Sequence, residues 1–99
     1  MEKRPSVLRA LEEKDPEFFK LVMDVMKAAT SEGALDAKTK TLISLALDAA
    51  GGHVEGVKGI AERARKMGIL EKEIAETLRL AFLVGGFPGL VTGLKAYQE

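Results

Sequence analysis

The chain has 99 residues and contains no cysteine, and the charges of its 15 basic and 15 acidic side chains cancel. A balanced charge disfavours nucleic-acid binding, which needs an excess of Lys and Arg to displace counterions from phosphates. The lack of cysteine excludes disulfide bonds and thiol chemistry within this chain. The length fits one domain over 1–99, and we expect a short N-terminal helical arm at 1–14 and a core at 15–99.

The first residues do not resemble a secretory signal. Met1–Lys3 is charged, and Pro5, Arg9 and Glu12–Asp15 stand where an apolar stretch would be required. We therefore expect a cytoplasmic protein. The chain has no Asn and one Gln, while Lys and Glu abound, a composition typical of proteins from hot environments.

The first long helix is expected to begin after Asp15. Asp at the N-cap followed by Pro16 is a strong helix-start signal. Apolar side chains at helical spacing continue to about Thr30 and predict a core face. They are Phe18, Phe19, Val22, Met23 and Met26.

Two further helices are expected between Asp36 and Met67. Asp36 is a suitable N-cap for the first, whose apolar residues from Leu42 to Ala50 cover most of its circumference and predict a central, buried helix. Gly51-Gly52 ends it. The second begins near His53 and is closed at Met67 by Gly68.

A fourth helix is expected from Glu71 through Leu83, although Leu70 offers no polar N-cap. The sequence 85–89 should break the chain before a last helix from Pro88 to Tyr97, and this break, with Arg79, argues against a membrane span. Glycines 85, 89 and 93 recur every four residues and should let another helix approach closely. No β pattern is present, so the predicted class is all-α.

Several of these features together resemble the carboxymuconolactone decarboxylase / alkyl hydroperoxidase D superfamily over about residues 15–98. The features are the stretch 35–47, Ala61, Ala64, Gly68, Glu73-Ile74 and Gly86-Phe87-Pro88. The resemblance implies a compact bundle of five to six helices of the alkyl hydroperoxidase D-like type. It also implies a homo-oligomer, a trimer or hexamer, and the surplus of apolar residues in a small domain agrees with self-association.

The thiol-using branch of the superfamily relays protons and electrons through a Glu, two Cys and a His. Gap-free placement puts these four roles at Thr41, His53, Gly56 and Ile60, so none is retained. A thiol peroxidase of this type is therefore excluded. The lactone-decarboxylating branch needs no cysteine, but its histidine also falls at Ile60.

His53 is the only histidine and is our candidate acid/base residue, because only histidine titrates near pH 7 without perturbation. The candidate pocket lies between helices 36–50 and 53–67 and is lined by Thr41, Leu45, Gly56 and Ile60 beside His53. In the alternative interpretation His53 is an ordinary helix-start residue and Thr41 bonds its own preceding carbonyl. No metal or cofactor is expected, since a lone histidine is a poor metal site.

The glycines at 52, 56 and 59 also need an explanation. Each costs a helix roughly 1 kcal/mol relative to alanine, so either close packing or room for a ligand should compensate.

Three functions stay open from sequence. The first is cofactor-free acid/base or decarboxylation chemistry on a small organic acid or lactone, in an uncharacterised family member. The second is a non-catalytic oligomeric scaffold or small-ligand-binding protein. The third, a helix-turn-helix nucleic-acid binder, is weak at zero net charge and would use Lys58, Arg63, Arg65 and Lys66.

Overall fold

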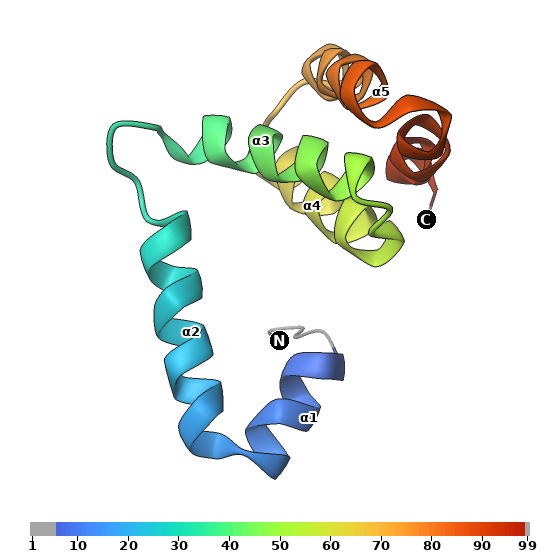
Figure 1. The fold of residues 1–99 in the computed structure, drawn as a ribbon. Coiled ribbons are helices and arrows are strands. Elements are labelled where there is room, and N and C mark those ends of the chain that lie inside the picture. The colour runs from blue at the N-terminus through green and yellow to red at the C-terminus, as the bar shows by residue number, and fades with distance from the viewer. Residues whose placement is uncertain (1–5, 99) are drawn as a thin grey trace. The chain divides into compact units, whose positions relative to one another are not determined.

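The computed structural model describes residues 6–98, and these form helices without any strand (Figure 1). The elements are α1 (Ser6–Lys14), α2 (Pro16–Thr30), α3 (Ala37–Ala50), α4 (Val54–Lys66), α5 (Glu71–Gly93) and a 3-10 helix, η1 (Leu94–Tyr97). The prediction of an all-α chain with five to six helices is confirmed. Residues 1–3 and Pro5, which entered the expectation about a signal sequence, lie outside the described residues.

The chain divides after Glu32 into two compact units, and each is described by itself. In the first, α2 begins as predicted: Asp15 Oδ1 accepts a hydrogen bond from the Phe18 N–H at 3.2 Å, and Pro16 opens the helix. The predicted core face of α2 is wrong for this unit. No residue of α2 is buried, and Phe18 is 53% exposed, because two helices alone cannot enclose a side chain on all sides.

In the second unit, α3 packs against both α4 and α5 (Figure 1). Asp36 caps α3 by accepting a hydrogen bond from the Thr39 N–H at 2.8 Å. The buried core consists of Leu45, Ala49, Val57, Ala61, Ala64, Ile69, Ile74, Leu78, Ala81 and Ala96. The helix α3 is central, but the expectation that it is buried all round is wrong. Ile43 and Leu47 are 43% and 66% exposed, since its two neighbours cover only part of its circumference.

The predicted close approach of a second helix at the spaced glycines is confirmed. A Cβ added to Gly85 would lie 3.0 Å from Cα of Ala50, and one added to Gly89 would lie 3.5 Å from the same atom. At Gly93 the added Cβ would lie 3.5 Å from Cβ of Ala49. These glycines therefore let α5 pack against the C-terminal end of α3.

The break in α5 is shorter than the predicted stretch 85–89. Only Gly86 leaves the helical conformation, with φ 67° and ψ −162°, a backbone shape that favours glycine. Pro88 lies near the start of the second half of the helix, where its missing N–H costs no helical hydrogen bond. The chain therefore bends at one residue and resumes the helix directly.

Glu71–Tyr97 is long and apolar enough to pass a length-and-composition test for a membrane span, which is weak evidence for a single helix. The kink at Gly86 interrupts it, and one of its sides packs into the core of the second unit.

Candidate functional site

The corner between α3 and α4 places His53 beside the end of α3. Gly51 ends α3, and Gly52 has φ +78°, a left-handed conformation that favours glycine and reverses the chain. The His53 N–H donates to the backbone carbonyl of Asp48 at 2.9 Å, and His53 then starts α4 as its N-cap residue. The Gly-Gly turn thus folds His53 back over the last turn of α3.

A side-chain contact reinforces this turn: His53 Nδ1 lies 2.9 Å from Oδ1 of Asp48. An ionised carboxylate can only accept hydrogen bonds, so Nδ1 donates to it and the neutral ring leaves Nε2 as an acceptor. The side chain of His53 is 66% exposed and that of Asp48 is 26% exposed. A carboxylate that fixes one ring nitrogen while the other remains accessible is the arrangement used by histidine acid/base catalysts.

Two glycines provide the space for this pair. A Cβ on Gly56 would lie 2.7 Å from Cγ of Asp48, and a Cβ on Gly51 would lie 3.0 Å from Cε1 of His53. Of the two explanations for the glycines of α4, close packing accounts for Gly56, whose neighbour is the carboxylate of Asp48. Gly59 has nothing within 4 Å of its added Cβ among the described residues, so close packing does not explain it there, and room for a ligand stays a prediction.

Sequence reasoning missed Asp48, although a signal was present. An acidic residue in the last turn of a helix faces the negative end of the helix dipole, which disfavours it, and α3 has no basic residue there. An acid in that position just before Gly-Gly-His indicates a partner across the turn.

The structure does not bring the remaining candidates to His53 as one cluster. Thr41 is 7% exposed, and its hydroxyl donates to the Ala37 carbonyl at 2.8 Å, the local bond considered as the alternative. Its Oγ1 also lies 3.5 Å from Sδ of Met67, which follows the C-terminal end of α4, whereas His53 lies at the N-terminal end. Thr41 and His53 therefore lie at opposite ends of the α3–α4 pair.

Leu45 and Ile60 belong to the packed region between α3 and α4. Leu45 is fully buried, and Ile60 is half-buried against the core. Their side chains fill space in this chain, so their role as pocket lining stays a prediction. Among the described residues, no group of three or more His, Cys, Asp and Glu side chains could hold a metal ion.

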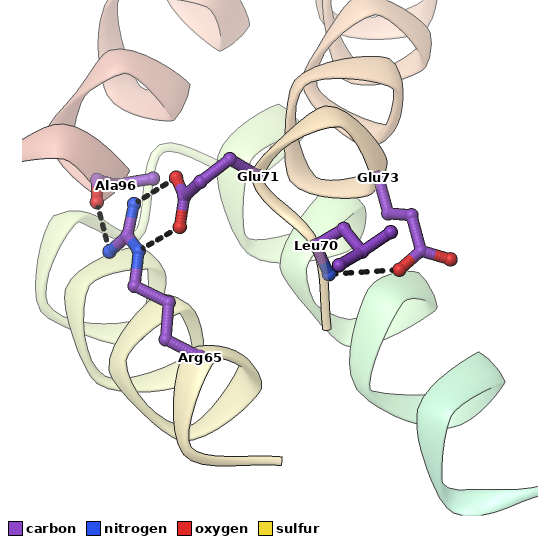
Figure 2. A network of polar contacts seen from close by, with 5 residues as sticks. All are labelled: Arg65, Leu70, Glu71, Glu73 and Ala96. Atoms are coloured by element: carbon purple, nitrogen blue, oxygen red, sulfur yellow. Dashed lines mark hydrogen bonds and ion pairs between the residues drawn. The ribbon is translucent and has the colours of Figure 1, made fainter. Parts of the chain in front are cut away.

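A second polar cluster joins the C-terminal end of α4 to α5 and η1 (Figure 2). Arg65 contacts both carboxylate oxygens of Glu71, at 2.7 and 3.1 Å, and donates to the Ala96 carbonyl at 2.9 Å. The hydrogen bond from Arg65 lowers the pKa of Glu71. The side chain of Arg65 therefore links three elements of the second unit, a structural role that does not require a ligand.

The missing polar N-cap at Leu70 is explained in the same view. Glu73 reaches back three residues, and its Oε1 accepts the Leu70 N–H at 2.9 Å (Figure 2). Glu73 also pairs with Lys38 of α3, and the hydrogen bond from Lys38 is the main cause of its lowered pKa. One acidic residue thus caps α5 and ties it to α3.

A surface hollow of about 530 Å³ is lined by Lys58, Glu62, Arg65, Lys66 and Gln98. It contains three of the four basic residues considered for nucleic-acid binding. Arg65 is held by Glu71, and Lys66 pairs with Glu62 at 3.1 Å. Carboxylates therefore already partner two of these cations, which weakens the nucleic-acid alternative further.

Comparisons with known proteins found similar sequences and a similar solved structure. The chain is 33% identical over 87 residues to an uncharacterized protein of Cupriavidus necator, covering 88% of this chain and 77% of that protein. It is 29% identical over 84 residues to an uncharacterized protein of Methanocaldococcus jannaschii, covering 85% and 78%. The crystal structure of an apo carboxymuconolactone decarboxylase family protein from Legionella pneumophila matches with a TM-score of 0.85 and 32% identity, covering 92% of this chain and 81% of that one.

The model of the Carboxymuconolactone decarboxylase family matches residues 16–99. The match begins at the first residue of α2, extends through all the later elements and includes the Asp48–His53 corner. The chain therefore belongs to the carboxymuconolactone decarboxylase family, as a member without cysteine.

Proposed function

We propose that this protein performs cofactor-free acid/base chemistry, such as decarboxylation, on a small organic acid or lactone, with His53 as the acid/base residue. The observation that carries the proposal is the 2.9 Å contact between His53 Nδ1 and Asp48 Oδ1. It holds the ring so that the exposed Nε2 can take a proton from a bound acid or return one to it. Family membership supports this class of substrate, and the chain supplies no thiol for the alternative peroxidase chemistry.

The pair alone does not make a complete pocket. His53 lies at a surface corner of the chain, so we further propose a cytoplasmic homo-oligomer, a trimer or hexamer, in which a neighbouring copy helps to enclose it. The many exposed apolar side chains on α3 and α5 support self-association.

The decisive experiment measures turnover with defined probes. Carboxymuconolactone and a set of small β-keto acids and lactones would be incubated with the protein, and release of carbon dioxide and loss of substrate would be followed. We expect His53→Gln to lower kcat/KM by about 100-fold or more, the usual contribution of a general acid or base. The matched control is Glu55→Gln, an exposed residue of the same helical turn, which should leave kcat/KM unchanged.

Asp48→Asn separates a positioning role from a structural one. It should lower kcat with little change in KM and alter the pH profile, because the histidine tautomer is no longer fixed. If His53→Gln retains wild-type kcat/KM on a substrate that the protein turns over, the acid/base role of His53 is wrong.

The second candidate is a non-catalytic oligomeric scaffold or small-ligand-binding protein. It is favoured by the fully buried Leu45 and by the Thr41 hydroxyl, whose proton is already donated to Ala37. This candidate predicts a stable oligomer that turns over none of the probes and whose properties are unaffected by His53→Gln.

A further inference from the structure

Within the second unit, α5 carries five apolar side chains that the neighbouring described helices of that unit leave exposed. Three of them precede the kink at Gly86 and two follow it, and together they are here called the α5 stripe: Leu80, Leu83, Val84, Phe87 and Val91. Their exposed fractions are 61%, 76%, 82%, 72% and 59%. Single exposed apolar residues are ordinary on a protein surface, but a group of five within twelve residues of one chain segment marks an interaction face.

The other side of α5 is fixed in the core, so the stripe is held in place. Ile74, Thr77, Leu78, Ala81 and Gly89 are buried there. No residue from 80 to 94 carries a charge, and the nearest charged residues along the chain are Arg79 and Lys95. An apolar centre with a polar border is the usual layout of a protein–protein interface.

An aromatic contact with the neighbouring Phe82 restrains Phe87 of the stripe. The rings of Phe82 and Phe87 lie edge to face across the kink at Gly86, with centroids 5.4 Å apart and planes at 71°. This contact restricts Phe87 before any partner arrives, which reduces the entropy lost on binding. Rigid aromatic side chains near the centre of an interface commonly supply most of its binding energy.

A lipid bilayer fits this surface poorly. Even as an unbroken helix the uncharged stretch 80–94 would span only about 22 Å, shorter than the roughly 30 Å hydrocarbon core of a membrane. A helix lying on a membrane surface needs a solvated, basic opposite face, whereas the opposite face of α5 is packed in the core.

A second copy of the chain fits it better. The five side chains offer on the order of 300–600 Å² of apolar surface, so two facing stripes would bury about 600–1,200 Å², close to the lower end of specific interfaces. Leu47 of α3 is 66% exposed and can extend the contact. It lies three residues before Ala50, the residue that Gly85 approaches. An uncharged stripe offers no selectivity for an acidic or basic partner, but it matches itself across a twofold axis, which a hexamer of dihedral symmetry contains and a cyclic trimer does not.

We propose that the α5 stripe is the face through which two copies of this chain associate, with Phe87, held by its contact with Phe82, as the aromatic anchor. The proposal rests on the self-association proposed above and specifies its surface.

The test compares Val84→Glu with Val7→Glu by sedimentation equilibrium over a range of concentrations. Val7 on α1 is 71% exposed and has the same size, so it is the matched control. The wild type should sediment as a multiple of 10.7 kDa. Val84→Glu should weaken association by about 100-fold or more, because a buried, unpaired carboxylate is costly, and Val7→Glu should not.

A second measurement does not depend on a disruptive variant. The chain has no cysteine, so Leu83→Cys introduces a unique thiol into the stripe. A bifunctional thiol cross-linker should join two such chains at protein concentrations at which Val7→Cys chains stay single.

The outcomes separate this proposal from the broader one. An oligomer whose association and cross-linking ignore changes in the stripe would overturn the interface but leave self-association standing. A monomeric wild type would overturn both. A monomer that binds phosphatidylcholine vesicles through Val84 would identify a lipid surface as the occupant instead.

Discussion

Replacing Gly56 by alanine should break the Asp48–His53 contact while α4 remains folded. The added Cβ would lie 2.7 Å from Cγ of Asp48, so the carboxylate must rotate away from its position beside the histidine ring. An aspartate side chain can turn about its first bond without moving the backbone. The strain is therefore relieved at the expense of the polar contact.

The expected change in stability follows from two opposing effects. Replacing glycine by alanine stabilises a helix by up to about 1 kcal/mol, and by less in the first turn, where Gly56 lies. Losing a solvent-exposed hydrogen bond costs roughly 0.5–1.5 kcal/mol. The two nearly cancel, so we expect the free energy of unfolding of Gly56→Ala to stay within about 1 kcal/mol of wild type.

Gly59→Ala is the control. Gly59 lies in the interior of the same helix and has nothing within 4 Å of its added Cβ. It should raise the free energy of unfolding by about 0.5–1 kcal/mol and the Tm by roughly 2–8 °C.

The assay uses the single histidine of the chain. Long-range proton–nitrogen NMR correlations report which ring nitrogen is protonated, and urea denaturation reports stability. Wild type and Gly59→Ala should keep the Nδ1-protonated tautomer, whereas Gly56→Ala and Asp48→Asn should shift toward a mixture. If Gly56→Ala keeps the wild-type tautomer and is stabilised as much as Gly59→Ala, the inferred clash between a Cβ at position 56 and Asp48 is wrong.

Two further results are expected. Leu45→Ala, at a fully buried position of α3, should lower the free energy of unfolding by about 2–5 kcal/mol in urea denaturation, and a loss below 1 kcal/mol would contradict the packed core between α3 and α4. Because Arg65 lowers the pKa of Glu71 in the folded chain, the stabilising contribution of Glu71 is present above its ordinary pKa of 4.5 and is lost as pH falls through the lower, folded value. Between about pH 5 and pH 3, the range in which this contribution begins to be lost, the wild type should therefore lose more stability than Glu71→Gln. Equal losses would show that the Arg65–Glu71 pair contributes nothing to stability.

The helix boundaries could be predicted because they depend on neighbouring residues. Asp15 and Asp36 each cap the backbone N–H three positions later, and Gly68 adopts φ +83° after the end of α4. These signals act over three or four residues, so the chain order carries them directly. Several of the residues that resemble the family also mark helix starts and helix ends. The sequence was therefore enough to identify the family.

The partners of individual side chains were harder to predict. Asp48 was not recognised as the partner of His53, because their contact depends on how the Gly51-Gly52 turn closes. Arg65 was considered from sequence as a nucleic-acid contact, yet it meets Glu71 and the distant Ala96 carbonyl. Contacts between elements depend on how the helices pack together, which local propensity does not determine.

The sequence by itself thus determined the all-α class, the caps at Asp15 and Asp36 and the family, because local hydrogen bonding and helical periodicity set them. Only the tertiary structure decided which faces of the apolar helices are covered. It buries Leu45 but leaves Leu47 of the same helix and Leu83 of α5 exposed, because burial depends on which neighbours a helix finds. It also decided that a carboxylate, rather than solvent alone, holds the single histidine, because α3 and α4 meet where Gly56 leaves room for Asp48.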